Sequence, residues 1–233
     1  MSLLATGEEL SFAWRQDFIQ AFLQRDLPAL GVGVAPDTLH RFWRMLAHLQ
    51  GQVFNASALG ASLGGVAHTT VARYLDILVE TMMVRRLEPE LRNVGKRLVK
   101  SPKVYLRDSG LLHALLGIRR LDDLQGHPIV GASWEGFVLE QIAAHMPAGS
   151  SLGFYRTAAG TEMDVVVATG RRRVGFEIRF AAAPKVGKGF WLALEDLELD
   201  AACVVAPVER GYPLGANAEV VGVHQIEGVF SQH

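Results

Sequence analysis

The first 120 residues are dominated by apolar positions that recur every three to four residues, the spacing of amphipathic helices. We expect helices over residues 8–30, 38–50, 56–63, 68–81 and 110–116. Helix ends are marked by glycine or proline, and three polar residues stand at helix starts where a side-chain oxygen can cap the first turn. These expected caps are Asp37, Asn55 and Asp108.

From about residue 150 the pattern changes to short runs rich in branched and aromatic residues, which predict β-strands. The expected strands cover residues 154–156, 163–168, 174–180, 201–206 and 219–223. A helix over 134–146, capped by Ser133, precedes them, and another over 188–197 interrupts them. A helix, an antiparallel strand group, a crossover helix and a further strand predict an α/β sandwich.

Part of the helical half has the length and order of a winged helix-turn-helix. Two helices are separated by Gly64 and Gly65, and strands over 83–87 and 104–106 then enclose a basic loop over 92–100. Winged helices also serve as packing or protein-binding modules, and a basic loop equally suits a solvated surface. If the module binds DNA, the second helix and the wing would supply the contacts: His68, Thr69, Thr70, Arg73, Lys96, Arg97, Lys100 and Lys103.

Composition indicates a globular protein. The chain has 233 residues, of which 49% are hydrophobic and 20% charged, and its net charge is −1. The net charge is close to zero, but charge is unevenly distributed along the chain. Residues 85–107 contain eight basic and two acidic side chains, which gives this segment a charge of +6. A single cysteine, Cys203, excludes a disulfide scaffold, and we find no secretory signal or membrane span. A cytoplasmic protein without membrane partners is expected.

Three carboxylates are candidates for one site. Glu135 shares a helix face with Val138 and Ile142, which should point into the core. Asp164 falls roughly opposite Glu177 if the hairpin turns near residue 170. Carboxylates of this kind suit Mg²⁺ or Mn²⁺, with Glu135, Asp164 and Glu177 as metal ligands. The alternative is a structural ion pair between Glu177 and its strand neighbour Arg179.

Several short segments together resemble the PD-(D/E)xK, restriction-endonuclease-like domain, a domain of unknown function, at the C-terminus of a large bacterial and archaeal group of AAA-type ATPases. The segments in the second half are GASWEGF (131–137), FYRT (154–157), GTEMD (160–164) and GFEIR (175–179). Those in the first half are FLQRDLP (22–28), KSPKVY (100–105) and DSGLL (108–112). The resemblance covers nearly the whole chain and implies a winged helix followed by a nuclease-like α/β sandwich.

The resemblance also assigns catalytic positions. Glu135 matches the helix acid, Asp164 the first sheet acid and Glu177 the acid of the ExK element, where Arg179 replaces the usual lysine. Arginine is a permanently charged planar fork, whereas lysine is a compact cation that can orient or deprotonate water. We therefore expect weak or absent cleavage, with binding of Mg²⁺ or Mn²⁺, or of phosphate, less affected.

Members of this group carry an ATPase domain with a phosphate-binding loop, and the sequence contains no GxxxxGK[ST]. The chain should not hydrolyse ATP, and we expect it to be a piece or natural remnant that starts after the ATPase domain. The expected divisions are a helical segment (1–36), a winged helix (37–107), a linker (108–128) and a nuclease-like domain (129–227). The expected function is nucleic-acid binding, with DNA and the ATPase domain as partners. The alternatives are an active Mg²⁺-dependent nuclease and a protein-interaction platform that regulates the ATPase domain.

Overall fold

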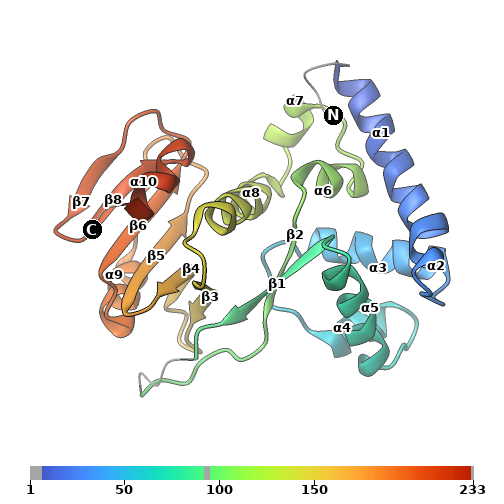
Figure 1. Ribbon diagram of the computed structural model, residues 1–233, viewed down its shortest axis with the longest axis horizontal. Helices are drawn as coiled ribbons and strands as arrows, with labels where there is room; N and C mark the ends of the chain where they lie inside the picture. Colours follow the sequence, from blue (N-terminus) through green and yellow to red (C-terminus); the bar gives the residue numbers. More distant parts are fainter. Residues whose placement is uncertain (1–6, 92–94, 232–233) are drawn as a thin grey trace. The chain divides into compact units, whose positions relative to one another are not determined.

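The computed structural model describes residues 7–91 and 95–231 of the chain. The backbone divides into two compact units (Figure 1). Of the described residues, the first unit contains 7–86 and 104–133, and the second contains 87–91, 95–103 and 134–231. The division differs from the predicted domains because the basic segment 87–103 belongs to the unit that holds the sheet, and not to the helical unit.

Helices build the first unit, and their apolar faces share one core. Phe42, Trp43 and Leu46 of the second predicted helix are fully buried, together with Val71 and Leu78 of the fourth. The first helix includes a wider, π-type turn, η1, that continues without a break into a short last turn. The helices are α1 (Gly7–Ala21), η1 (Phe22–Asp26), α2 (Leu27–Ala29), α3 (Pro36–His48), α4 (Ala56–Ser62), α5 (His68–Glu80), α6 (Ser109–Leu115) and α7 (Leu121–Gln125).

Two of the three predicted caps in this unit are confirmed. The side chain of Asn55 accepts a hydrogen bond from the N–H of Ala58 at 3.0 Å, and that of Asp108 accepts one from the N–H of Leu111 at 2.8 Å. Asp37 is wrong as a cap. Helix α3 already begins at Pro36, whose fixed φ and missing N–H suit the first helical position.

The segment that follows α5 corrects the predicted wing. Strand β1 (Val84–Pro89) ends against β3 (Ser151–Arg156), where Glu88 pairs in parallel with Gly153. Further along, the N–H of Val99 donates to the carbonyl of Arg156 at 2.9 Å, and the N–H of Ala158 donates to the carbonyl of Arg97 at 2.8 Å. The edge of β3 offers unpaired backbone groups that this segment satisfies, so the basic residues are not carried on a free hairpin.

The sheet mixes parallel and antiparallel pairs, as expected for an α/β unit. Hydrogen-bonded neighbours among the described strands follow the order β2-β1-β3-β4-β5-β6-β8-β7. Strands β3, β4 and β5 pair antiparallel, and β6 and β8 continue the sheet in parallel. The remaining bounds are β2 (Lys103–Leu106), β4 (Glu162–Thr169), β5 (Arg172–Ile178), β6 (Ala201–Ala206), β7 (Tyr212–Gly215) and β8 (Ala218–Gly222).

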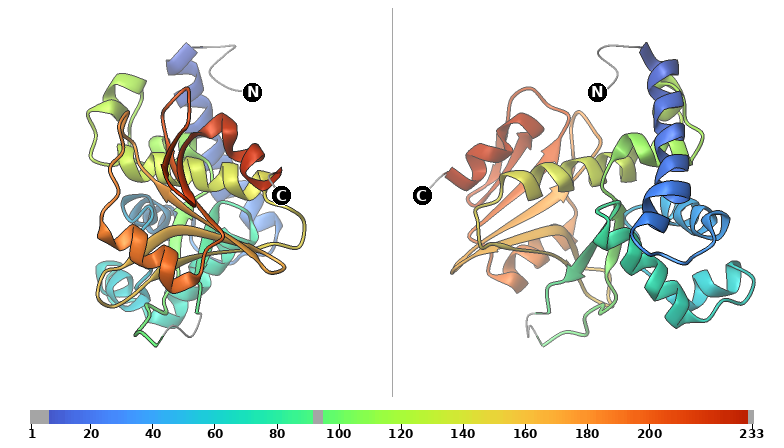
Figure 2. Two further views of the ribbon diagram at one scale, coloured as in Figure 1. Left: turned by 90° about the vertical axis from the view of Figure 1, so that its left-hand side faces the viewer. Right: turned by 45° about the vertical axis from the view of Figure 1, so that its right-hand side comes forward.

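Helices cover both faces of this sheet in the second unit. Helix α9 (Lys188–Leu197) lies on one face, and α8 (Val130–His145) and α10 (Ile226–Ser231) lie on the other (Figure 2). Phe190 and Leu197 pack on the α9 face, while Phe176 contacts Phe230 on the other. A short 3₁₀ turn, η2 (Val223–Gln225), leads into α10.

Four details of the prediction are wrong or incomplete. Ser133 lies inside α8 and not at its cap, with its buried hydroxyl 2.7 Å from Nε2 of His113. The predicted linker after α6 contains α7, and the pattern did not reveal β7 or α10. These three elements are short, and β7 is an exposed edge strand with a proline, so each lacks a clear apolar period. No helix in residues 7–91 and 95–231 has both the length and the apolar character needed to cross a membrane.

Gly60 provides a test of the packing between α4 and its closing turn. A Cβ at this position would lie 2.2 Å from the carbonyl oxygen of Val66, a backbone atom that cannot rotate away. We expect Gly60→Ala to lower the free energy of unfolding by about 1–3 kcal/mol. In Gly131→Ala, the matched control in α8, a Cβ meets nothing within 4 Å and should stabilise by up to about 1 kcal/mol. Urea unfolding measures both, and equal effects would contradict the packing.

Candidate functional site

Two of the predicted carboxylates meet on the β4–β5 hairpin. The register pairs Val165 with Phe176, so Asp164 and Glu177 are the next residues along the two strands. The N–H of Ile178 donates to Oδ2 of Asp164 at 2.9 Å, and both acidic side chains are buried. Asp164 and Glu177 therefore lie opposite each other, as predicted from a hairpin turn near residue 170.

Lys103 brings a third carboxylate to the same place. Its Nζ lies 2.7 Å from Oε1 of Glu162, 3.5 Å from Oε1 of Glu135 and 3.7 Å from Oδ1 of Asp164. Glu135 reaches this position from α8, whose neighbouring residues Val138 and Leu139 are fully buried and fix the helix. The lysine itself is 3% exposed and lies over the ring of Phe154, 5.4 Å from its centroid.

Arg179 completes the group from the end of β5. Its Nη2 donates to Oε1 of Glu177, and its Nη1 lies 4.0 Å from Oδ2 of Asp164. Unlike Lys103, Arg179 keeps 47% of its side chain exposed. The three acids predicted to converge are thus linked through two cations, Lys103 and the predicted Arg179. We call the six residues the acidic cluster: Lys103, Glu135, Glu162, Asp164, Glu177 and Arg179.

Burial and charge shift the protonation equilibria of this cluster. Burial alone would lower the pKa of Lys103, but the surrounding Glu135, Asp164 and Glu162 outweigh it and raise the pKa, so the ammonium stays charged. Desolvation raises the pKa of Asp164, against the opposing effect of Lys103. Desolvation and the nearby Asp164 raise the pKa of Glu177 to about 8, although Arg179 opposes the shift.

The cluster has oxygen donors suited to Mg²⁺ or Mn²⁺, yet its arrangement does not fit a metal. A divalent cation needs carboxylate oxygens at about 2.0–2.6 Å, and Nζ of Lys103 already lies between the oxygens of Glu135, Glu162 and Asp164. Within the described part of the chain, no group of three or more His, Cys, Asp or Glu side chains is placed to hold a metal ion. The ligand role expected of Glu135, Asp164 and Glu177 stays a prediction.

The structure differs from the sequence prediction in the location of Lys103 and in the presence of Glu162 in the acidic cluster. Sequence reasoning put Lys103 on an exposed wing, which is wrong because its side chain is buried and ion-paired. Lys103 directly precedes the apolar run Val104–Leu106, and this position in the sequence could have indicated that it is buried. Glu162 was missed, although it stands two residues before Asp164 and alternate strand residues share a face.

The other residues predicted to contact DNA fall in two groups. His68, Thr69 and Arg73 are exposed in the first turns of α5, and Thr70 is half-buried there. In the second unit Arg97 and Lys100 are exposed, and Lys96 bonds Oδ1 of Asp196 at 2.6 Å. Arg92, at the start of the predicted basic loop, lies outside the described residues.

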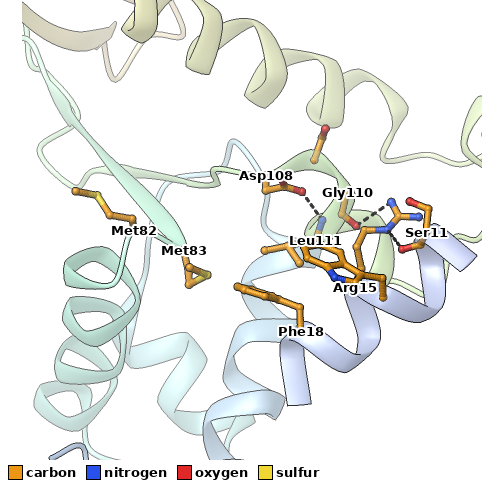
Figure 3. Close-up of a pocket in the computed structure, with 10 residues that line it drawn as sticks. Ser11, Arg15, Phe18, Met82, Met83, Asp108, Gly110 and Leu111 are labelled. Atoms are coloured by element: carbon orange, nitrogen blue, oxygen red, sulfur yellow. Dashed lines mark hydrogen bonds between the residues drawn. The ribbon is translucent and has the colours of Figure 1, made fainter. Parts of the chain in front are cut away.

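A separate pocket of about 450 Å³ lies in the first unit between α1, the residues Met82 and Met83 that precede β1, and the start of α6 (Figure 3). Phe18, Met83 and Leu111 give it a largely apolar lining. Its two charged side chains are bound to the protein's own backbone: Asp108 accepts from Leu111, and Arg15 donates to the carbonyls of Ser11 and Gly110. The acidic cluster is therefore the stronger candidate for chemistry.

Two family models match this chain. Residues 2–122 match a family described as a domain of unknown function (DUF8612), and residues 130–226 match a second, also described as a domain of unknown function (DUF4143). Relatives include the uncharacterized protein Rv2008c of Mycobacterium tuberculosis and the uncharacterized protein Mb2031c of Mycobacterium bovis, each 45% identical over 225 residues. The matches cover 97% of this chain and 51% of the relatives, so the chain spans about half of their length.

One solved structure with a weak likeness is the crystal structure of protein VC1899 from Vibrio cholerae. It is 14% identical with a TM-score of 0.28, and the match covers 93% of this chain and 54% of the other. A likeness at this level carries no argument for the fold.

The raised pKa of Glu177 predicts how stability depends on pH. Between about pH 4.5 and pH 8 the folded protein holds a proton on Glu177 that the unfolded chain releases. The free energy of unfolding should therefore fall as pH rises through this window, by at most about 1.4 kcal/mol per pH unit for one proton. Denaturant unfolding at several pH values should give a flatter profile for Glu177→Gln. The exposed Glu195→Gln should keep the wild-type slope, and equal slopes in all three proteins would contradict the assignment.

Proposed function

This chain belongs to the family described as a domain of unknown function (DUF8612), and we propose that it is the nucleic-acid-binding C-terminal region of an AAA-type ATPase. In this proposal its second unit is a nuclease-like domain with weak or absent cleavage activity, and its first unit contains a winged helix. The observation that carries the proposal is the buried ammonium of Lys103 among the carboxylates of Glu135, Glu162 and Asp164.

The acidic cluster supports a nuclease-like origin and a reduced activity together. Glu135, Asp164 and Glu177 come from a helix and a hairpin and meet around one point, as the acids of a PD-(D/E)xK site do. The charge that compensates Glu135 and Asp164 here is Lys103, which also pairs with Glu162, whereas Glu177 pairs with Arg179. An internal cation of this kind competes with any divalent ion for the same oxygens, so metal-assisted hydrolysis is expected to be weak.

Arg179 supports the same conclusion by its chemistry. Its guanidinium remains charged at any physiological pH and cannot take a proton from an attacking water. It also shares its donors with Glu177 and lies near Asp164. A planar fork with an exposed side chain is better suited to hold a phosphate than to activate a nucleophile.

Nucleic-acid binding is supported by surface charge. Residues 85–107 carry a net charge of +6, and within this segment Arg97 and Lys100 are exposed. The exposed start of α5 presents His68, Thr69 and Arg73, the place where a recognition helix of a helix-turn-helix contacts base edges. Basic side chains of this kind bind phosphates with a strong dependence on salt.

The ATPase partner is supported by the resemblance described above and by length. Motifs in both halves of the chain are similar to those that follow the ATPase domain in that group. The mycobacterial relatives are about twice as long as the matched region, which leaves room for such a domain in them. A direct role in ATP hydrolysis is not proposed for this chain.

Replacing Lys103 tests the nuclease-like part of the proposal. Lys103→Met keeps the length of the side chain and removes the ammonium, which should lower stability because buried carboxylates lose their partner, by about 3–5 kcal/mol. The variant should then be stabilised by millimolar Mn²⁺ in thermal unfolding, since the freed oxygens can bind the ion. Wild type and the exposed control Lys100→Met should show little response to Mn²⁺.

Cleavage assays on plasmid and single-stranded DNA complete this test. We expect wild type to leave both substrates intact in Mn²⁺ or to cleave them slowly. Efficient cleavage by wild type that Lys103→Met and Asp164→Ala both abolish would overturn the proposal in favour of an active nuclease. In that case Lys103 would supply the lysine that the ExK element lacks.

Reversing the exposed basic residues tests nucleic-acid binding. Arg97→Glu together with Lys100→Glu should weaken binding of labelled DNA in low salt at least tenfold and should reduce the dependence of affinity on salt concentration. The control, Lys185→Glu with Arg210→Glu, changes charge equally at exposed positions of the same unit and should have a smaller effect. Fluorescence anisotropy over a salt series measures both.

Two outcomes of this assay would change the conclusion. Equal losses of affinity in both double variants would show that DNA binding depends on the net charge of the protein and not on residues 97 and 100. If wild type binds no nucleic acid at low salt but binds the ATPase domain of a longer relative, the chain is an interaction platform.

A further inference from the structure

Three aromatic residues of the second unit are close in the sequence to Glu135 and Arg179 of the acidic cluster and are linked by ring contacts. Trp134 directly precedes Glu135 on α8, Phe137 lies one turn further along, and Phe180 directly follows Arg179. Ring centroids are 5.7 Å apart between Trp134 and Phe180, and 5.9 Å apart between Trp134 and Phe137. We call these three residues the aromatic platform.

The platform is unusually accessible for aromatic side chains. Phe137 is 39% and Phe180 48% exposed, although large apolar side chains gain free energy by leaving water. The rings are tilted to one another by 52° and 40°, so they do not cover each other's faces as stacked rings would. Ring surface is therefore available for a flat ligand.

Trp134 adds an unsatisfied hydrogen-bond donor. Its Nε1 is buried and has no hydrogen-bond partner. Most buried donors in proteins are paired, and an unpaired one costs free energy. The indole N–H is thus a donor that no acceptor in the described part of the chain satisfies.

Charge identifies the class of ligand. Arg179 adjoins Phe180 in the chain and leaves almost half of its side chain in solvent, where it can contact a phosphate. An aromatic surface next to a cation that can bind phosphate is the usual combination for unpaired nucleotides, whose bases stack on rings while the backbone follows positive charge. Bases inside a duplex are stacked on each other and cannot reach such a surface.

We propose that the aromatic platform binds an unpaired base of single-stranded nucleic acid, with Arg179 contacting the phosphate next to it. This inference rests on the proposed function and deepens it, because it assigns the substrate class of the nuclease-like unit. The acidic cluster would then serve as the anchor of Arg179, which holds the cation beside the stacked base.

Binding of a single strand and of a duplex by the full 233-residue chain tests the inference. The probes are fluorescein-labelled oligo-dT of 20 nucleotides and a labelled duplex of equal length, both at low salt. Phe180→Ala should raise the dissociation constant for the single strand about tenfold, the loss of one stacked base, and change that for the duplex by less than twofold. Phe180→Tyr, which keeps the ring, should bind as wild type does.

Tyr212→Ala is the matched control, because Tyr212 is a 39% exposed aromatic residue of the same unit on β7. It should leave binding of the single strand unchanged. Equal losses in Phe180→Ala and Tyr212→Ala, an equal loss on the duplex, or no loss in Phe180→Ala would overturn the platform while leaving nucleic-acid binding in place. Binding of neither probe by wild type would instead remove the proposed function itself.

Crosslinking of the unmodified protein gives a second readout that does not depend on the folding of a variant. Oligo-dT with a 5-iodouracil at its centre should crosslink on irradiation to peptides that contain Trp134, Phe137 or Phe180. Crosslinks confined to other peptides would overturn the proposal.

Discussion

The second unit depends on one buried charge. The ammonium of Lys103 holds three carboxylates that come from α8 and β4, so this ion-pair group ties the end of the segment 87–103 to the helix and to the hairpin. Ion pairs at this depth add little net stability over apolar packing, but loss of one partner leaves an uncompensated charge, at a cost of about 3–5 kcal/mol. The same contact sets the charge balance of the cluster.

The two cations of the cluster differ in what they can still do. Lys103 is buried, and its ammonium is ion-paired with carboxylates of the protein. Arg179 is ion-paired with Glu177, but almost half of its side chain is exposed to solvent. A raised pKa at Glu177 also means that the cluster carries less negative charge near neutral pH than four carboxylates suggest, which reduces repulsion of phosphates. Lys103 neutralises part of the buried negative charge, and Arg179 exposes positive charge to solvent. Both features favour the binding of phosphates.

Local features of the sequence predicted local features of the structure. The bounds of α9 and β6 agree with the apolar pattern, and Asn55 and Asp108 cap their helices as polar residues before an apolar run do. The pairing of Asp164 with Glu177 followed from the position of one turn. Failures occurred where the outcome depended on distant partners. The pattern near residue 100 predicts a basic wing, but open hydrogen-bond groups on β3 bind this segment instead, although Val99 and its partner Arg156 are far apart in the sequence.

That long-range pairing explains why the acids of the site could be predicted and their cation could not. Glu135, Asp164 and Glu177 lie within 43 residues of one another on a helix and a hairpin, whose periodicities place side chains by simple rules. Lys103 reaches them only because β1 pairs in parallel with β3 and the chain returns along the same edge. Parallel pairing of this kind has no turn signature in the sequence, since its partners are joined by long connections. The position of the acids therefore follows from local periodicity, whereas the position of the lysine that pairs with Glu135 and Asp164 follows from the pairing of a remote segment.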